Sequence, residues 1–120
     1  MVMTQRKDVQ GSVSTAYQAT STLFTYTVPI GMIAVLRKLA NYTDTAAGVN
    51  GATFWSLRKD GVPQAPYDAF FDIVGNQALP PDCETLVFPG GSIITGIGYN
   101  GYATATIKLG MRIQFDLIGK

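Results

Sequence analysis

The sequence offers few side chains that could perform catalysis. It contains no histidine, the residue that most often serves as general base, as metal ligand or as partner of a nucleophilic Ser or Cys. A cupin-type metal site needs a histidine cluster, and a thiolate zinc site needs several cysteines, whereas Cys83 is the only cysteine here. We expect Cys83 to be an idle or buried thiol, with a reactive or intermolecular role as the alternative. The inventory predicts a protein that is not an enzyme and that holds no cofactor.

Carboxylates are the remaining candidates for chemistry. Five acids lie in a region that has no basic residue from position 61 to position 107: Asp60, Asp68, Asp72, Asp82 and Glu84. Two of them could act as the acid pair of a glycosidase, and Asp68, Asp72 and Asp82 could hold calcium with loop carbonyls. Their spacing matches no calcium loop, so the principal expectation is solvated loop carboxylates and no metal site.

Three glycines between positions 96 and 101 could suggest a nucleotide-binding motif. Gly96-x-Gly98-x-x-Gly101 has the spacing of a dinucleotide fingerprint, but it lies in a β pattern with no helix after it. By strand periodicity Gly96 and Gly98 share a face with Ile94, which leaves that face nearly bare. We expect tight sheet packing there, with a subunit contact as the alternative.

The elements that position these residues are predicted to be β-strands, because the hydrophobic pattern is mostly alternating. Between positions 103 and 117, apolar residues at odd positions alternate with mostly polar ones at even positions, which predicts one long strand with one buried face. Shorter strands are expected around 23–28, 32–42, 53–59, 84–88 and 92–99, with an edge or irregular segment at 62–67 and a short apolar segment at 69–74. The dipeptides Asp60-Gly61 and Asn100-Gly101 predict hairpin turns. About eight strands and no convincing helix predict an all-β antiparallel sandwich, a jelly roll, with an immunoglobulin-like sandwich as the second choice.

The N-terminal segment differs in composition from the rest. Residues 1–22 are polar and small, so we predict an extended N-terminal arm that orders on a neighbouring subunit, followed by a sandwich domain over residues 23–120. A frayed terminus is the alternative. The four-residue spacing of Val9, Val13 and Tyr17 would also suit a short helix, although the surrounding Ser and Thr residues disfavour one.

Charge argues for protein partners. Charged residues make up 14% of the chain, the net charge is +1 and the basic residues are scattered, so no nucleic acid is expected as a partner. The start of the chain lacks an apolar signal sequence and no apolar run approaches the roughly 20 residues that span a bilayer, so no membrane partner is expected either. Residues 85–107 carry no charge, which suggests that part of this stretch is covered in a homo-oligomer.

The expected interface combines the arm, the bare glycine face and tyrosines beside turns, which could also stack on sugars. Its candidate residues are Arg6, Val9, Val13, Tyr17, Tyr67, Ile94, Gly96, Gly98, Tyr99 and Tyr102.

Three segments carry a resemblance to a known group of proteins. They are FTYTVPIG at 24–31, WSLRKDG at 55–61 and VFPGGS at 87–92. In style and turn placement the chain resembles, over residues 23–119, the small jelly-roll structural proteins of tailed-phage virions. The resemblance implies a capsid cement (decoration) protein, assembled in the host cytoplasm and located in the virion. It also implies a homotrimer that binds the major capsid protein or another virion protein at capsomer junctions. The alternative is a receptor- or carbohydrate-binding module of a phage tail, fibre or baseplate.

Overall fold

The chain folds into strands. The computed structural model describes residues 3–43, 53–69, 80–101 and 106–119. Within these ranges there is no helix, and the strands are β1 (Met3–Thr15), β2 (Thr20–Thr27), β3 (Met32–Thr43), β4 (Phe54–Lys59), β5 (Val62–Pro63), β6 (Val87–Pro89), β7 (Ile93–Tyr99) and β8 (Ile107–Gly119). The all-β prediction is confirmed.

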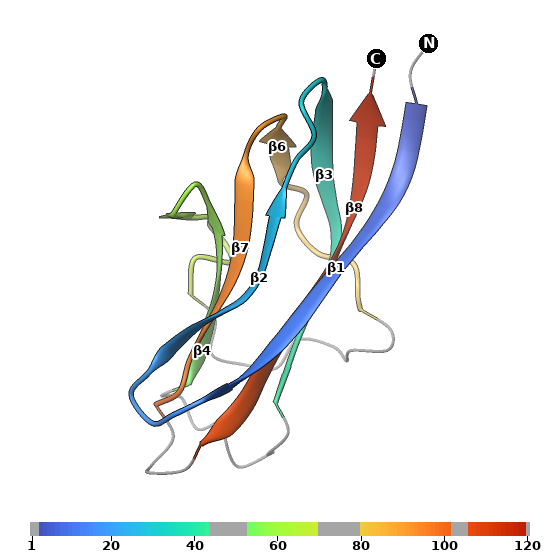
Figure 1. Cartoon of the computed structure of the whole chain (residues 1–120). Helices are drawn as coiled ribbons and strands as arrows, with labels where there is room; N and C mark the ends of the chain where they lie inside the picture. The colour runs from blue at the N-terminus through green and yellow to red at the C-terminus, as the bar shows by residue number, and fades with distance from the viewer. Residues whose placement is uncertain (1–2, 44–52, 70–79, 102–105, 120) are drawn as a thin grey trace.

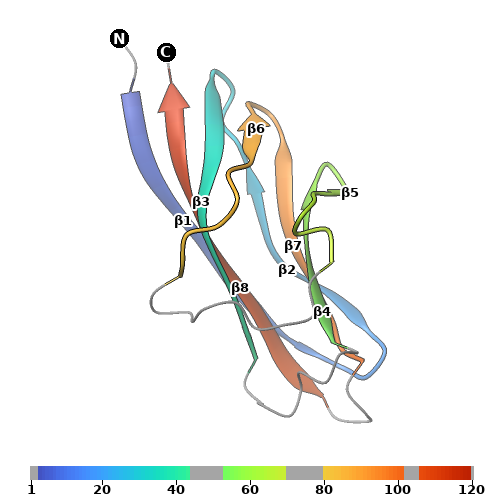
Figure 2. The same ribbon diagram turned by 180° about the vertical axis from the view of Figure 1, so that it is seen from behind.

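Two antiparallel sheets pack face to face as a sandwich (Figures 1 and 2). One sheet has the order β1-β8-β3-β6 and the other has the order β2-β7-β4-β5. Strand 1 therefore neighbours strand 8, 2 neighbours 7, 3 neighbours 6 and 4 neighbours 5, with successive pairs placed in alternate sheets. This order is consistent with the predicted jelly roll, in which a long antiparallel ribbon is rolled into two layers.

β8 is the spine of the first sheet. It pairs with β1 along its whole length on one side and with β3 on the other. Ile107, Leu109, Met111, Ile113 and Phe115 are all buried, and the residues between them are more exposed, apart from Gly110. The predicted alternation is thus confirmed from Ile107 onward, while the start of the predicted strand, at 103–105, lies outside the described residues.

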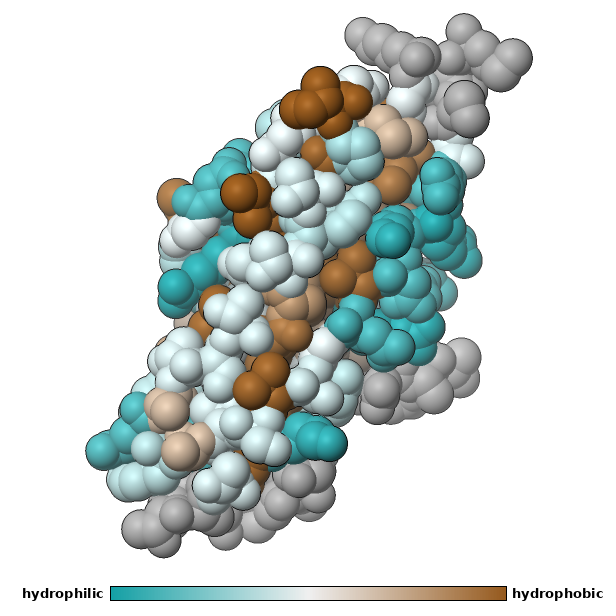
Figure 3. Space-filling view, in the orientation of Figure 1, coloured by the Kyte–Doolittle hydropathy of each residue, from teal (hydrophilic) through white to brown (hydrophobic). Residues whose placement is uncertain are grey.

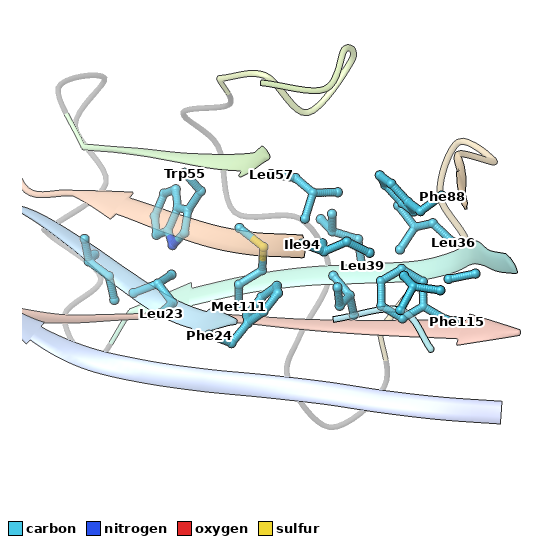
Figure 4. Close-up of a cluster of buried hydrophobic side chains, with 14 of the residues drawn as sticks. Leu23, Phe24, Leu36, Leu39, Trp55, Leu57, Phe88, Ile94, Met111 and Phe115 are labelled. Carbon is cyan, nitrogen blue, oxygen red and sulfur yellow. The ribbon is translucent and has the colours of Figure 1, made fainter. Parts of the chain in front are cut away.

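The core fills the space between the sheets (Figure 4). Phe115 of β8 contacts Phe88 edge to face, with ring centroids 5.9 Å apart, and Tyr26 in a stacked arrangement at 5.8 Å. Trp55 and Leu57 of β4 enter the core from the second sheet and are completely buried, as the sequence pattern predicts. Burial of side chains of this size contributes roughly 1.5–3 kcal/mol each, which lets one domain fold without disulfides or metals.

The glycine face of β7 belongs to this core. An added Cβ at Gly96 would lie 2.4 Å from Cε2 of Phe24, and one at Gly98 would lie 2.9 Å from Cδ1 of Leu109. Ile94 has no exposed surface. The subunit contact considered for these three residues is therefore corrected: Gly96 makes room for the ring of Phe24 on the neighbouring strand β2, and Gly98 makes room for Leu109 of the opposite sheet, which is the tight packing that was the principal expectation.

The N-terminal segment is part of the sandwich. Residues 3–15 are extended, but they pair in unbroken register with β8 of the same chain, from Met3 opposite Gly119 to Thr15 opposite Ile107. Val9 and Val13 turn inward and pack against the core, which explains why the segment adds to the sheet. Their four-residue spacing marks the inner face of a strand and not a helix.

Candidate interface surfaces

Exposed hydrophobic side chains gather at one end of the sandwich. Among the described residues, six large hydrophobic side chains are exposed. Five of them lie in turns or near strand ends toward one end of the sandwich, which we call the apolar end: Ile30, Ile33, Val62, Val87 and Ile93. Ile33 and Val87 are on the outer side of the first sheet and Ile93 is on the outer side of the second, because their neighbours Ala34, Phe88 and Ile94 face the core. Ile30, in the turn between β2 and β3, is 84% exposed. In Figure 3, hydrophobic atoms appear in brown at the upper end of the molecule, where Figure 1 places the β2–β3 turn. Several exposed apolar side chains at one end make that end a candidate binding surface.

Two turns pack against each other to build this end. Gly31 and Gly91 both have φ of 88°, in the left-handed region that favours glycine. The N–H of Gly91 donates to the carbonyl of Val28 at 2.8 Å, and a Cβ on Gly90 would lie 2.8 Å from the Pro29 carbonyl oxygen. A Cβ on Gly91 would lie 3.1 Å from Ile30 Cδ1, so the Ile30 side chain lies beside the second turn while most of its surface stays in solvent.

The β4–β5 hairpin fixes the other border of the apolar end. Asp60 and Gly61 both have positive φ, as the predicted Asp-Gly hairpin requires. The Asp60 carboxylate accepts a hydrogen bond from the N–H of Ile93 at 2.9 Å, and the Asp60 N–H donates to the Ile93 carbonyl at 2.8 Å. This reciprocal pair holds Ile93 beside the hairpin that carries Val62.

Charged residues lie on the outer face of the first sheet. Arg112 of β8 contacts Asp8 of β1 through two nitrogens, with Nε 3.0 Å from Oδ1, and Arg37 Nε lies 2.8 Å from Asp116 Oδ2. The hydrogen bond from Arg112 holds the pKa of Asp8 below its ordinary value. Arg6 is exposed and stands opposite Asp116 in the register. These cross-strand pairs are local supports of the sheet and form no catalytic arrangement.

The predicted acidic region supplies no shared site in the described part of the chain. No group of three or more metal-ligating side chains occurs there, and Asp72 lies outside the described residues. Asp82 lies 3.9 Å from Lys38 Nζ. Cys83 is half-buried, and burial raises the pKa of its thiol to about 11, so the thiol is protonated at neutral pH and a poor nucleophile.

The tyrosines expected at an interface have different surroundings. Tyr17 is 41% exposed in the β1–β2 turn, at the end of the sandwich away from the apolar end. Tyr99 is half-buried and stacks on Phe54 with centroids 5.0 Å apart. Tyr67 packs against the core, and its hydroxyl accepts a hydrogen bond from the Glu84 N–H at 3.0 Å. Tyr102 lies outside the described residues.

The structure thus divides the predicted interface residues. Arg6 and Tyr17 are exposed, Val9 and Val13 face the core, and Ile94, Gly96 and Gly98 are inside the sandwich. The sequence pattern did not lead us to predict the apolar end. Its signal was present in Pro29-Ile30-Gly31, where a large hydrophobic residue occupies a turn.

Comparison with known proteins adds no identification. No protein family matches the sequence, and no curated protein matches it. Within the described residues, no helix has the length and apolar character needed to cross a membrane.

Proposed function

We propose that the chain is a structural virion protein of the capsid cement type, which attaches by its apolar end to an assembled protein shell. The observation that carries the proposal is the exposure of five large hydrophobic side chains toward one end of the sandwich: Ile30, Ile33, Val62, Val87 and Ile93. The resemblance to small jelly-roll virion proteins supplies the kind of partner, a major capsid protein or another virion protein.

The mechanism follows from the surface that attachment would bury. Removing an isoleucine or valine side chain from water contributes roughly 1.5–3 kcal/mol, and the paired turns hold Ile30 in place before binding, so little ordering is needed. A protein that binds only the assembled shell stabilises that shell by mass action. Copies bound across capsomer junctions would therefore oppose the separation of capsomers.

Co-sedimentation with emptied, purified shells of the virus that encodes the chain tests the proposal. The wild-type protein should pellet with the shells in a saturable manner, and Ile30→Asp should weaken binding by tenfold or more. Ile30 is exposed, so the substitution should leave the fold intact, which a melting curve verifies.

Tyr17→Asp is the matched control, because it places the same charge on an exposed side chain at the opposite end. It should bind like wild type. If wild type does not pellet, or if Ile30→Asp binds as well as wild type, the proposal is wrong. Deletion of residues 1–22 is unsuitable as a test, since it removes β1 and the start of β2.

A second candidate is the receptor- or carbohydrate-binding module. The observation in its favour is the stacked pair Phe54 and Tyr99 near the end that carries Tyr17, because paired rings suit the apolar faces of sugars. A glycan array with wild type, Tyr17→Asp and Ile30→Asp separates the two candidates. A carbohydrate-binding module loses signal with Tyr17→Asp and keeps it with Ile30→Asp, and a cement protein gives no glycan signal.

A further inference from the structure

The four edge strands of the sandwich are protected to different degrees. β5 has two residues and β6 has three, and each contains a proline. β2 has a register irregularity between Thr22 and Phe24. Short length, proline and bulges are the usual devices that keep sheet edges from pairing with other chains. β1 is 13 residues long, contains no proline and keeps an unbroken register with β8. Its protection is charge: Arg6, Lys7 and Asp8 lie in its first half, and Lys7 Nζ lies 5.6 Å from the centroid of the Tyr26 ring.

The side of the sandwich formed by β1 and β2 is also poor in charge. From Val9 to Leu36 the sequence contains no Asp, Glu, Lys or Arg, so β2 and the second half of β1 are uncharged. Figure 3 shows this side as a broad pale band between more hydrophilic areas. The regular and neutral second half of β1, residues 9–15, is therefore the part of this edge that can act as a template for another strand.

Residues of similar type lie at equal distances before and after Gly11 in β1. Val9 and Val13 lie two residues on either side of it on the inner face, and Gln10 and Ser12 flank it on the outer face. An antiparallel strand centred on Gly11 would place Val9 opposite Val13, Gln10 opposite Ser12 and Asp8 opposite Ser14 of a second copy. No like charges would face each other, whereas a pairing centred on Lys7 would oppose the two Lys7 side chains.

We propose that β1 pairs antiparallel with β1 of a second copy about a two-fold axis at Gly11, which joins the two β1-β8-β3-β6 sheets into one. The inner-face valines then meet valines, the outer-face amides meet hydroxyls, and the exposed backbone of both edges is hydrogen-bonded. This two-fold pair differs from the trimer that the resemblance implies. It is independent of shell attachment, because β1 and the apolar end use different residues.

Light scattering coupled to size exclusion measures the number of chains directly. Wild type should have twice the 12.9 kDa mass of one chain. Gln10→Glu/Ser12→Glu would place two glutamates opposite two glutamates at the centre of the pairing and should elute as a single chain, with a dissociation constant raised about tenfold or more. Both positions are exposed, and residue 10 stands opposite Arg112, so the single chain should fold normally.

A charge swap tests the register. Gln10→Lys/Ser12→Lys mixed with the glutamate variant should restore the two-chain mass, because each glutamate then faces a lysine. Ala69→Glu/Thr85→Glu adds the same charge at exposed positions outside the strands and should remain a pair. A one-chain or three-chain mass for wild type overturns the proposal. So does a glutamate variant that stays paired, a mixture that stays single or a control that dissociates.

Discussion

Asn100 holds the corner at which the chain crosses from one sheet to the other: its side-chain Nδ2 donates to the carbonyl oxygen of Thr15 at 2.9 Å. The backbone of Asn100 adds two further bonds, accepting from the Gln18 N–H at 2.7 Å and donating to the Ala19 carbonyl at 3.1 Å. Asn100 and Thr15 are both buried, so the side-chain bond that ties the turn between β1 and β2 to the end of β7 is shielded from water.

Replacing that side chain should destabilise the fold. Asn100→Ala leaves the Thr15 carbonyl without this donor and is expected to lower the free energy of unfolding by about 1–3 kcal/mol. Urea denaturation followed by tryptophan fluorescence measures the change, since Trp55 lies in the core. Ser14→Ala, an exposed position on β1, is the control and should change stability by less than about 0.5 kcal/mol. An Asn100→Ala protein as stable as the control would contradict this role.

The glycine face of β7 makes a second prediction. Gly96→Ala would bring a methyl group to 2.4 Å from the Phe24 ring, so the ring or the strand must move. We expect a loss of about 1–3 kcal/mol by the same denaturation assay, as for other overpacked cores. Thr95→Ala, which alters the neighbouring residue on the other face of β7, should be milder. Equal stability of Gly96→Ala and wild type would mean that the Phe24 ring does not lie over Gly96 as described.

The pair of Asp8 and Arg112 should give the stability a specific acid dependence. Hydrogen bonding to Arg112 holds the pKa of Asp8 below its ordinary value of 3.8. The carboxylate therefore stabilises the fold fully above that value, and its contribution is lost as pH falls from 3.8 through the lower pKa of the folded state. Asp8→Asn should flatten the fall in stability over this window, with a cost above it of about 0.2–1 kcal/mol for a partly exposed pair. Parallel acid titrations of the melting temperature measure it, and identical curves for the two proteins would contradict the pairing.

Cys83 should react slowly while the protein is folded. With the pKa of the thiol at about 11, only a small fraction is thiolate near neutral pH, far less than for a free cysteine, whose pKa is about 8.5. Alkylation by iodoacetamide, followed by intact mass, should be slow at neutral pH and should accelerate as pH approaches 11. Unfolding in urea should abolish the difference from a free thiol. Rapid alkylation of the native protein at neutral pH would instead point to a reactive cysteine.

The local sequence pattern predicted where the strands lie better than it predicted which strands pair with each other. The alternation through Met111 and Phe115 identified β8 because one of its faces is buried along the whole strand. The pairing of β1 with β8 joins opposite ends of the chain. The polar composition of residues 3–15 does not indicate which strand they pair with, because that strand is distant in the sequence. Composition suggested a separate arm because only Val9 and Val13 show the inward periodicity. The position of β1 in the sheet is set by its hydrogen-bonded pairing with β8.

The candidate surface was harder to predict for a related reason. Exposure depends on which turns meet, and Ile30 is exposed because the β2–β3 turn packs on Gly90 and Gly91, which are far along the chain. Gly96 and Gly98 leave the same bare face in the sequence whether a core ring or a partner fills it, and only the position of Phe24 decides. The prediction of assembly from the uncharged residues 85–107 stays a prediction, and the surfaces proposed above for it are the apolar end and the β1 edge.

Amide hydrogen exchange on the free and the shell-bound protein tests attachment through the apolar end most directly. The account predicts that amides around Ile30, Val87 and Ile93 gain protection when the protein binds purified shells, while those of the turn at Tyr17 and Gln18 exchange as in the free protein. Protection confined to the Tyr17 turn, or no change around Ile30 in protein that has bound the shell, would contradict it.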